Sequence, residues 1–136
     1  MAIPPRQRDE LIARARQARR HAYAPYSGYP VGAALLTKGG TIYEGVNVEN
    51  AAYPTGMCAE RSAVFSAVSK GEREFSAIAV VTADGGMPCG SCRQVLTEFA
   101  PEIVVFIADG EGKLVAETTA RDLLPRAFGP ENLGRR

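Results

Sequence analysis

Segments with helical and with strand-like hydrophobic periods alternate along this chain. Residues 6–23 place small and aliphatic side chains on one face and arginines on the other, which predicts an amphipathic helix. We expect the helix to end before Pro25, because proline disfavours helical geometry in the residue that precedes it. Its apolar face consists of Leu11, Ala15, Ala18 and Ala22.

The remaining pattern predicts five strands and three further helices. We expect strands over residues 31–37, 42–48, 75–81, 103–108 and 114–117. We expect helices over residues 58–70 and 89–99, a short capped helix at 119–122 and an irregular tail from about residue 130. Long helical crossovers between strands pack helices on both faces of a sheet. The order therefore predicts an α/β fold, a three-layer α/β/α sandwich with a central five-stranded mixed sheet.

Length and charge favour a single domain that acts on a small molecule. The chain has 136 residues, which suffice for one domain over residues 1–136 and leave no room for a second. A net charge of +1 provides no global field for nucleic acid or for an acidic membrane surface. The arginines near the N-terminus offer a basic nucleic-acid face as an alternative, although we favour the solvated side of an amphipathic helix. They are Arg6, Arg8, Arg14, Arg16, Arg19 and Arg20.

The N-terminal segment does not have the pattern of a signal peptide. Ile3, Pro4 and Pro5 are followed by charged residues, without an apolar run of the length that a signal peptide needs. No segment approaches the length of a membrane span. We therefore expect a cytoplasmic protein without a membrane partner, in which three cysteines are reduced thiolates and not a disulfide framework.

The three cysteines predict a catalytic zinc site. Cys58 stands alone, and Cys89 and Cys92 form a C-x-x-C pair about thirty residues later. Structural zinc sites usually have four protein ligands, whereas catalytic sites leave the fourth position to water. Three thiolates leave that position open. The single histidine, His21, lies among arginines and aromatic residues in no ligand-like spacing, so we do not place it on the metal.

Two charged residues, two and three positions after Cys58, predict hydrolytic chemistry. Glu60 would lie near the metal without binding it, as a carrier of protons to and from water must. Three thiolates on Zn²⁺ leave the site with a net charge of about −1. We expect two groups to offset this charge: the N–H groups of two helix N-termini, bonded to the sulfurs, and Arg61. The alternatives are a first-turn helix acid at Glu60 and a surface helix residue at Arg61.

Six segments in the same order resemble the short, homotetrameric type of zinc-dependent cytidine deaminase, within the cytidine/deoxycytidylate deaminase superfamily. A cysteine or histidine two residues before a glutamate, followed by Pro-Cys-x-x-Cys, is a signature of these enzymes. The resemblance implies one Zn²⁺ per chain, held by Cys58, Cys89 and Cys92, with Glu60 as the catalytic residue. It also implies hydrolytic deamination of cytidine and 2′-deoxycytidine to uridine and 2′-deoxyuridine, with release of ammonia, in pyrimidine salvage. The matching segments cover residues 24–27, 31–35, 47–53, 58–61, 88–95 and 123–128.

The same resemblance implies a set of substrate-binding residues. Asn47 and Glu49 match positions that contact the sugar hydroxyls, and the period of a strand places both side chains on one side. Tyr29 stands where the family usually has Phe, whose ring packs on the base or sugar, and Ala59 matches a further substrate contact. The alternative for the Asn47 and Glu49 pair is an ordinary polar strand end.

Two aromatic residues match positions that reach into the site of an adjacent subunit. They are Tyr53 and Phe128, and they imply a homotetramer whose sites are completed by neighbouring chains. A chain of this length has little left to build a lid over an open metal site, yet the chemistry needs water excluded around the base. The alternative is ordinary local packing of both rings.

Four other functions compete with this interpretation. A C-x-x-C thiol redox protein would use Cys89 and Cys92, but it leaves Cys58 and Glu60 without a role. A structural zinc site needs a fourth protein ligand, and the sequence offers none at a suitable spacing. Among deaminases, the alternative substrate is a cytosine-bearing antibiotic nucleoside such as blasticidin S. Deamination of a polynucleotide fits the near-neutral charge less well.

Overall fold

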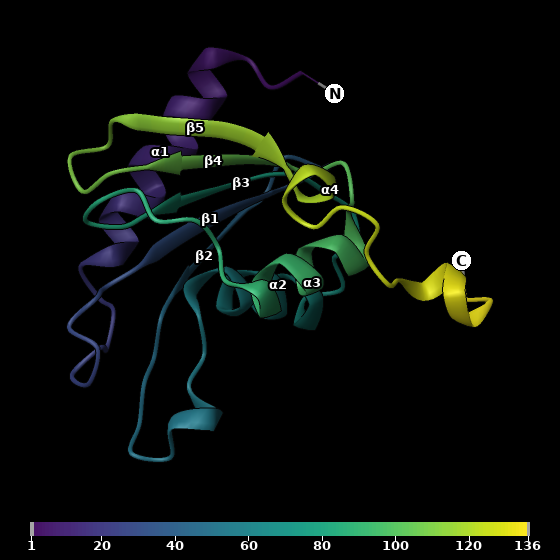
Figure 1. The fold of residues 1–136 in the computed structure, drawn as a ribbon. Coiled ribbons are helices and arrows are strands. Elements are labelled where there is room, and N and C mark those ends of the chain that lie inside the picture. The colour runs from purple at the N-terminus through teal and green to yellow at the C-terminus, as the bar shows by residue number, and fades with distance from the viewer. Residues whose placement is uncertain (1, 136) are drawn as a thin grey trace.

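A five-stranded mixed sheet forms the centre of the protein, in the order β2-β1-β3-β4-β5 (Figure 1). The structure is a computed structural model, and it describes residues 2–135. Strands β3 and β4 are parallel, and the other neighbouring pairs are antiparallel, which confirms the predicted mixed sheet. The strands are β1 (Gly32–Thr37), β2 (Ile42–Val46), β3 (Phe75–Val81), β4 (Val104–Ala108) and β5 (Leu114–Thr119).

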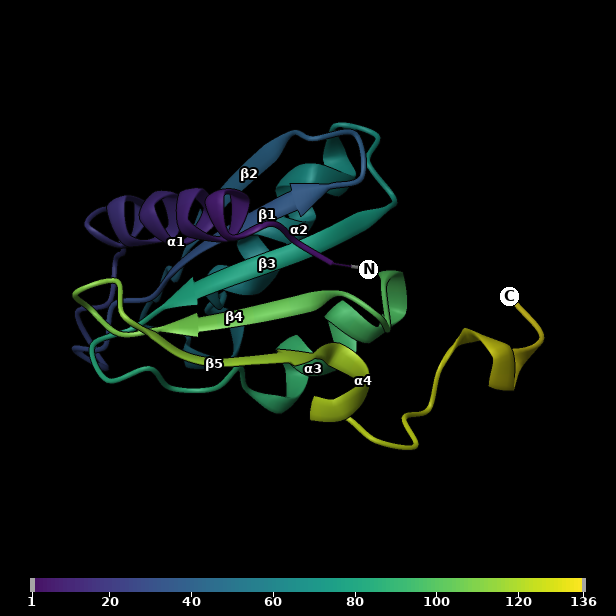
Figure 2. The ribbon, with the colours of Figure 1, turned by 90° about the horizontal axis from the view of Figure 1, so that it is seen from above.

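Helices cover both faces of this sheet and make three layers. Helix α1 lies on one face and helices α2 and α3 lie on the other (Figure 2). The predicted α/β/α sandwich is therefore confirmed. The helices are α1 (Pro5–Arg19), α2 (Ala59–Ser69), α3 (Gly90–Phe99) and α4 (Ala120–Leu123), and two 3₁₀ turns are η1 (Tyr53–Thr55) and η2 (Pro130–Leu133).

Strand β1 shows why both faces need a helix. Successive strand residues point to opposite faces. Ala33 and Leu35 join the core under α2 and α3, whereas Ala34 and Leu36 join the core under α1. All six residues of β1 are consequently buried, so two hydrophobic cores share a single sheet.

The close packing of α2 on the sheet depends on Gly45 in β2. A Cβ atom at this position would lie 2.4 Å from the carbonyl oxygen of Ala59 and 2.4 Å from the amide nitrogen of Ala63. Only glycine allows the two backbones to come this close. The contact fixes the first turn of α2, and with it Cys58, beside the end of the sheet.

The first helix and the second strand are both shorter than predicted. Helix α1 ends at Arg19 and not at residue 23, and β2 ends at Val46 and not at residue 48. The chain leaves the helix because Tyr23 pairs with Val48 in a parallel bridge, with its N–H donated to the carbonyl of Asn47 at 2.9 Å. This bridge brings the segment after α1 next to the predicted site residues.

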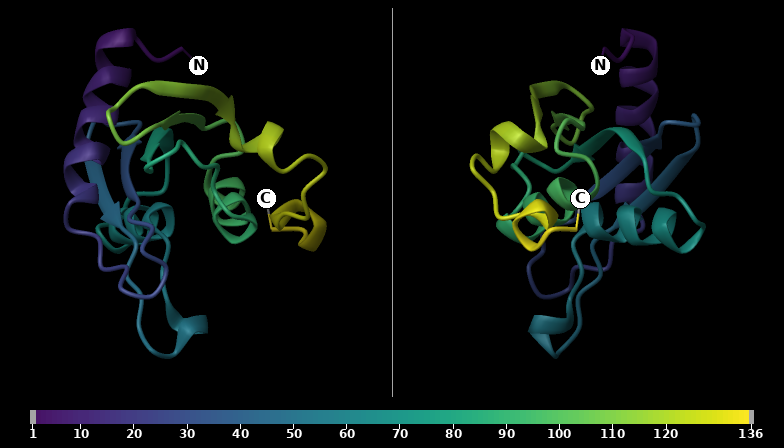
Figure 3. Two further views of the ribbon diagram at one scale, coloured as in Figure 1. Left: turned by 60° about the vertical axis from the view of Figure 1, so that its left-hand side comes forward. Right: turned by 90° about the vertical axis from the view of Figure 1, so that its right-hand side faces the viewer.

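Two segments project from the sandwich. The segment with η1 extends below the body in Figure 1 and in both views of Figure 3, and the chain after α4 runs away from the body in Figures 1 and 2. The tail was expected to be irregular, but Pro130–Leu133 forms a 3₁₀ turn because Asn132 Oδ1 accepts from the amide of Gly129 at 2.8 Å. Within residues 2–135, no helix combines the length and apolar character that crossing a membrane requires.

Candidate active site

The three cysteines converge at the N-termini of two helices. Cys58 is the N-cap residue of α2, Cys89 is the N-cap residue of α3, and Cys92 lies in the first turn of α3. All three Sγ atoms lie within 4.8 Å of one another. Over residues 2–135, no fourth histidine, cysteine or acidic residue joins this group. The arrangement leaves one coordination position open, as a catalytic zinc site requires.

The chemistry of the sulfur atoms fits a thiophilic metal ion. The hydrogen bond with Cys92 is the main reason that the pKa of Cys58 falls to about 5, with a further contribution from Arg61. The same contact, together with burial, raises the pKa of Cys92. One thiol thus already shares its proton with a neighbouring thiolate, and a cation that binds thiolates replaces such protons. The group fits one Zn²⁺ per chain.

Arg61 lies beside the sulfur atoms, as the sequence predicts. Its Nη2 donates to Sγ of Cys58 at 3.2 Å, and its Nε is buried without a hydrogen-bond partner. We expected helix N–H groups to bond the sulfurs, but neither Cys58 nor Cys89 accepts a capping hydrogen bond from its helix. Their sulfurs instead approach each other at 3.8 Å. A guanidinium therefore supplies the direct contact that offsets the negative charge.

Glu60 is a buried carboxyl group at the edge of the metal group. Only 5% of the residue is exposed, and it lines the same cavity as Cys58 and Cys89. Burial is the main reason that its pKa rises to about 7, and the negative charge of Cys58 adds to the rise. A carboxyl group with this pKa gains and loses a proton readily at neutral pH, which suits general acid–base chemistry.

A cavity of about 260 Å³ opens beside Glu60 and is mostly apolar. A second cavity of about 300 Å³ adjoins it and shares Asn47, Glu49 and Cys58 with the first. Small-molecule sites are typically apolar hollows with a few polar groups that fix orientation. The first cavity is lined by Ser27, Tyr29, Val31, Asn47, Glu49, Cys58, Glu60, Val80, Thr82, Gly86, Met87 and Cys89.

Asn47 and Glu49 line both cavities. Each also forms hydrogen bonds with residues 26–31, which we call the rim segment. Asn47 Oδ1 accepts from the amide of Val31 at 2.8 Å, and its Nδ2 donates to the carbonyl of Tyr29 at 2.9 Å. The Glu49 carboxylate accepts from the Ser27 amide at 3.1 Å and from the Ser27 hydroxyl at 2.5 Å. The hydroxyl contact is the main reason that the pKa of Glu49 is lowered. This holding role has no counterpart in the sequence interpretation.

The other four predicted substrate contacts occupy different environments. The ring of Tyr29 lines the first cavity, and its hydroxyl donates to Asp84 at 2.6 Å. Ala59 is fully buried in the core and lines neither cavity. Tyr53 is exposed and lines the second cavity, whereas Phe128 is exposed on the projecting tail, with its carbonyl bound by Gln94.

Sequence reasoning missed several residues of the cavity. Val80 and Thr82 come from the end of β3, and Gly86 and Met87 come from the loop that leads to Cys89. None belongs to a motif with chemistry of its own. The one available signal is their position in the sequence, since they lie between the end of β3 and the C-x-x-C pair at the start of α3.

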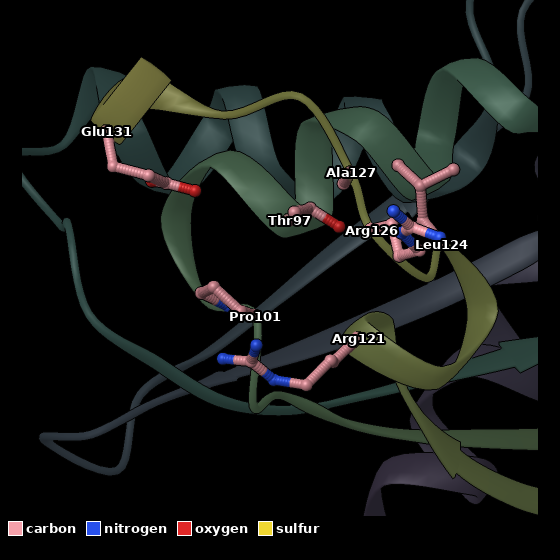
Figure 4. Close-up of a pocket in the computed structure, with 7 residues that line it drawn as sticks. All are labelled: Thr97, Pro101, Arg121, Leu124, Arg126, Ala127 and Glu131. Carbon is pink, nitrogen blue, oxygen red and sulfur yellow. The ribbon is translucent and has the colours of Figure 1, made fainter. Parts of the chain in front are cut away.

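Another hollow, of about 410 Å³, lies between α3, α4 and the tail (Figure 4). It contains Thr97, Arg121 and Glu131 and none of the predicted site residues. Charges of both signs line it, and Arg121 is paired with Glu102. The residues that carry chemistry meet elsewhere, around the thiolates.

The fold and the site define a class of protein, an α/β/α sandwich with an open three-thiolate metal site beside a buried carboxyl group. Residues 5–108 match the family described as "Cytidine and deoxycytidylate deaminase zinc-binding region". The chain belongs to this family.

Three known proteins illustrate the similarity. The chain is 51% identical to a cytidine deaminase of Sporosarcina psychrophila over 128 residues, which cover 92% of this chain and 93% of that protein. The crystal structure of a cytidine deaminase from Burkholderia pseudomallei superposes with a TM-score of 0.83 at 50% identity, over 88% of this chain and 97% of that one. A blasticidin-S deaminase of Bacillus cereus is 38% identical over 108 residues, which cover 72% of this chain and 76% of that protein.

Proposed function

We propose that this protein catalyses the zinc-dependent hydrolytic deamination of cytidine and 2′-deoxycytidine to uridine and 2′-deoxyuridine, with release of ammonia. The observation that carries the proposal is the position of Glu60. Its carboxyl group is buried in the cavity that the thiolates of Cys58 and Cys89 also line, and its pKa is raised to about 7. The identity to cytidine deaminases over most of the chain supports the same substrate class.

The chain's own residues account for the proton movements of this reaction. Cys58, Cys89 and Cys92 would hold the zinc ion, which would supply activation of the attacking water. Glu60 takes a proton from the attacking water and delivers it to the ring nitrogen, which makes the carbon that bears the amino group electrophilic. The oxygen of this water bonds to that carbon, and the carboxylate of Glu60 then takes the proton of the new hydroxyl group and gives it to the amino group. The carbon–nitrogen bond breaks, ammonia leaves, and the hydroxyl oxygen becomes the carbonyl of the uracil ring. The near-neutral pKa of Glu60 suits it to both the basic and the acidic step.

The sugar is proposed to lie against Asn47 and Glu49. Both side chains line the cavity next to the thiolates, and an amide beside a carboxylate suits neighbouring hydroxyl groups. The carboxylate of Glu49 already accepts three hydrogen bonds from the rim segment, two from amides and one from Ser27 Oγ. Contacts to the sugar would therefore add to a site that is already ordered. The ring of Tyr29 completes the proposed contacts.

The active form is proposed to be a homotetramer. Tyr53 and Phe128 are each 62% exposed, although large aromatic rings are normally buried. Both lie on segments that project from the body of the protein (Figure 3). A neighbouring subunit would bury these rings and would cover the open side of its partner's cavity. This arrangement would exclude water around the base, which the chemistry requires.

The rival functions make different predictions. A thiol redox protein would need two cysteines only, whereas here three sulfurs and Arg61 form one group. Blasticidin S remains the alternative substrate within the family, since a deaminase of that antibiotic is also similar to this chain. A polynucleotide substrate has no support from the charge of the chain.

We place the enzyme in pyrimidine salvage in the cytoplasm, as a single domain.

The test is a direct assay of the purified protein. Loss of the cytosine absorbance should be followed with cytidine, 2′-deoxycytidine and blasticidin S in parallel. We expect both nucleosides to be converted to the uracil product with a higher kcat/KM than the antibiotic. Conversion of blasticidin S alone would move the assignment to the antibiotic. Conversion of none of them by zinc-loaded protein would overturn the proposed function.

A further inference from the structure

The hydroxyl group of Tyr29 joins two segments of the chain that line the cavity. The ring of Tyr29 belongs to the segment after α1, and its hydroxyl donates to Oδ1 of Asp84 at 2.6 Å. Asp84 lies 55 residues away in the loop between β3 and α3. That loop also carries Gly86, Met87 and Cys89, which line the cavity with Tyr29. One hydrogen bond therefore connects two segments that both contribute residues to the lining of the cavity.

The loop that receives this bond is itself well anchored. Thr82 is only 2% exposed, and its Oγ1 accepts from the amide of Gly86 at 2.7 Å. The same hydroxyl donates to Oδ1 of Asp84 at 3.4 Å. Asp84 thus receives donors from Thr82 and from Tyr29, and both contacts favour its charged form. A phenol that donates to a carboxylate forms one of the stronger hydrogen bonds in proteins.

The backbone of Gly86 lies close to the Tyr29 hydroxyl. A Cβ atom built at Gly86 would lie 2.5 Å from Oη of Tyr29, a distance at which one of the two must move. The next nearest atoms are Asp84 Oδ1 at 3.6 Å and Tyr29 Cζ at 3.7 Å, which are ordinary van der Waals distances. The hydroxyl oxygen is therefore the one atom among the nearest three that a Cβ atom at position 86 would clash with.

We propose that the hydroxyl of Tyr29, held by Asp84 and seated against Gly86, positions the aromatic wall of the substrate cavity. This inference rests on the proposed function, because it assigns the wall to the binding of a cytosine nucleoside. The hydroxyl of Tyr29 has a positioning role, because it contacts Asp84 and holds the ring that is proposed to contact the substrate. A side chain at position 86 would displace the ring or the loop, and both border the space that the substrate occupies.

The inference predicts a specific interaction between two substitutions. In the zinc-loaded protein, Gly86→Ala should raise KM for cytidine roughly tenfold or more, while kcat and zinc content change little. In a Tyr29→Phe background, the same Gly86→Ala change should alter KM by no more than about twofold, because the clashing oxygen is gone. The dissociation constant of uridine should follow the same pattern and does not depend on turnover. Gly39→Ala is the matched control, since its nearest contact would be at 3.8 Å in a distant turn.

A second pair of variants tests the role of Asp84. Asp84→Ala should weaken uridine binding in the Tyr29 protein and should have little effect in the Tyr29→Phe protein. An equal effect of Gly86→Ala in both backgrounds, on KM and on uridine binding, would overturn the inference. Should Gly86→Ala fail to fold, recovery of its melting temperature by Tyr29→Phe supports the inference, and no recovery overturns it. If no variant deaminates cytidine but the coupling in melting temperature persists, the proposed function fails while the contact remains.

Discussion

The guanidinium of Arg61 donates to the sulfur of Cys58 at 3.2 Å across the first turn of α2. The contact is the main reason that the pKa of Arg61 is raised, and it also helps to lower the pKa of Cys58. A guanidinium cannot lose its proton in a protein, so the charge at this position is permanent. An arginine one residue after a buried glutamate therefore stabilises the thiolate without competing for protons.

Replacement of Arg61 should weaken metal binding. We expect Arg61→Ala to lower zinc affinity by about 10- to 100-fold, the range seen when a group that supports a metal ligand is removed. Competition with a chromogenic chelator measures this change. Arg14→Ala is the control, because Arg14 pairs with Glu44 on the surface at 2.5 Å. Unchanged zinc affinity in Arg61→Ala would show that the sulfurs need no cation beside them.

Replacement of Glu60 by glutamine should separate metal binding from chemistry. Glutamine has nearly the same shape but cannot carry a proton, so Glu60→Gln should retain zinc and fold normally. The value of kcat/KM for cytidine should fall by at least about 10²–10⁴, the usual contribution of general acid–base catalysis. Steady-state kinetics with zinc analysis on the same sample provides the measurement. Near-normal turnover by this variant would remove Glu60 from the mechanism.

The raised pKa of Glu60 also predicts how stability depends on pH. Its carboxyl group has a pKa of about 7 when folded and an ordinary value of 4.5 when unfolded, so between these values the folded protein binds more protons. The stability that the neutral carboxyl contributes is fully present below pH 4.5 and is lost as pH rises through 7. As the pH rises through this window, the unfolding free energy of the zinc-free wild type should fall by roughly 3 kcal/mol relative to that of zinc-free Glu60→Gln. Urea unfolding at several pH values tests it, and a flat difference would contradict it.

Asn47 should contribute to stability as well as to binding. It is 9% exposed, and its amide bonds the backbone of Val31 and of Tyr29. Asn47→Ala leaves both backbone groups without a partner, so the free energy of unfolding should fall by about 1–3 kcal/mol. Chemical denaturation measures the loss, with Asn132→Ala in the projecting tail as the control. A loss no larger than that of the control would restrict Asn47 to substrate contact.

The zinc group could be predicted from the sequence because its chemistry is local. Cys58, Cys89 and Cys92 each sit at a helix start, and the spacing of two of them fixes their distance before any tertiary structure is known. The strand β3 was predicted with its observed bounds, since a run of buried residues between polar segments is unambiguous. The position of Glu60 near the sulfurs could be predicted as well, because Glu60 lies in the first turn of the helix that Cys58 caps.

The contacts between distant segments could not be predicted. The bond between Tyr29 and Asp84 joins residues 55 apart, and neither residue belongs to a motif that indicates the other. The early end of α1 depends on the pairing of Tyr23 with Val48, which is a tertiary contact and has no local signal. The direction of the cysteine sulfurs, toward one another and not toward the helix amides, likewise depends on how α2 and α3 are placed.

The most direct test of the account is a zinc titration of activity. Protein stripped of metal under reducing conditions should be titrated with Zn²⁺ while formation of uridine and ammonia from cytidine is measured. We predict that both products form in equal amounts and that the rate rises linearly to a break at one zinc per chain. Folded protein that binds one zinc per chain and leaves cytidine and 2′-deoxycytidine unchanged would contradict the account.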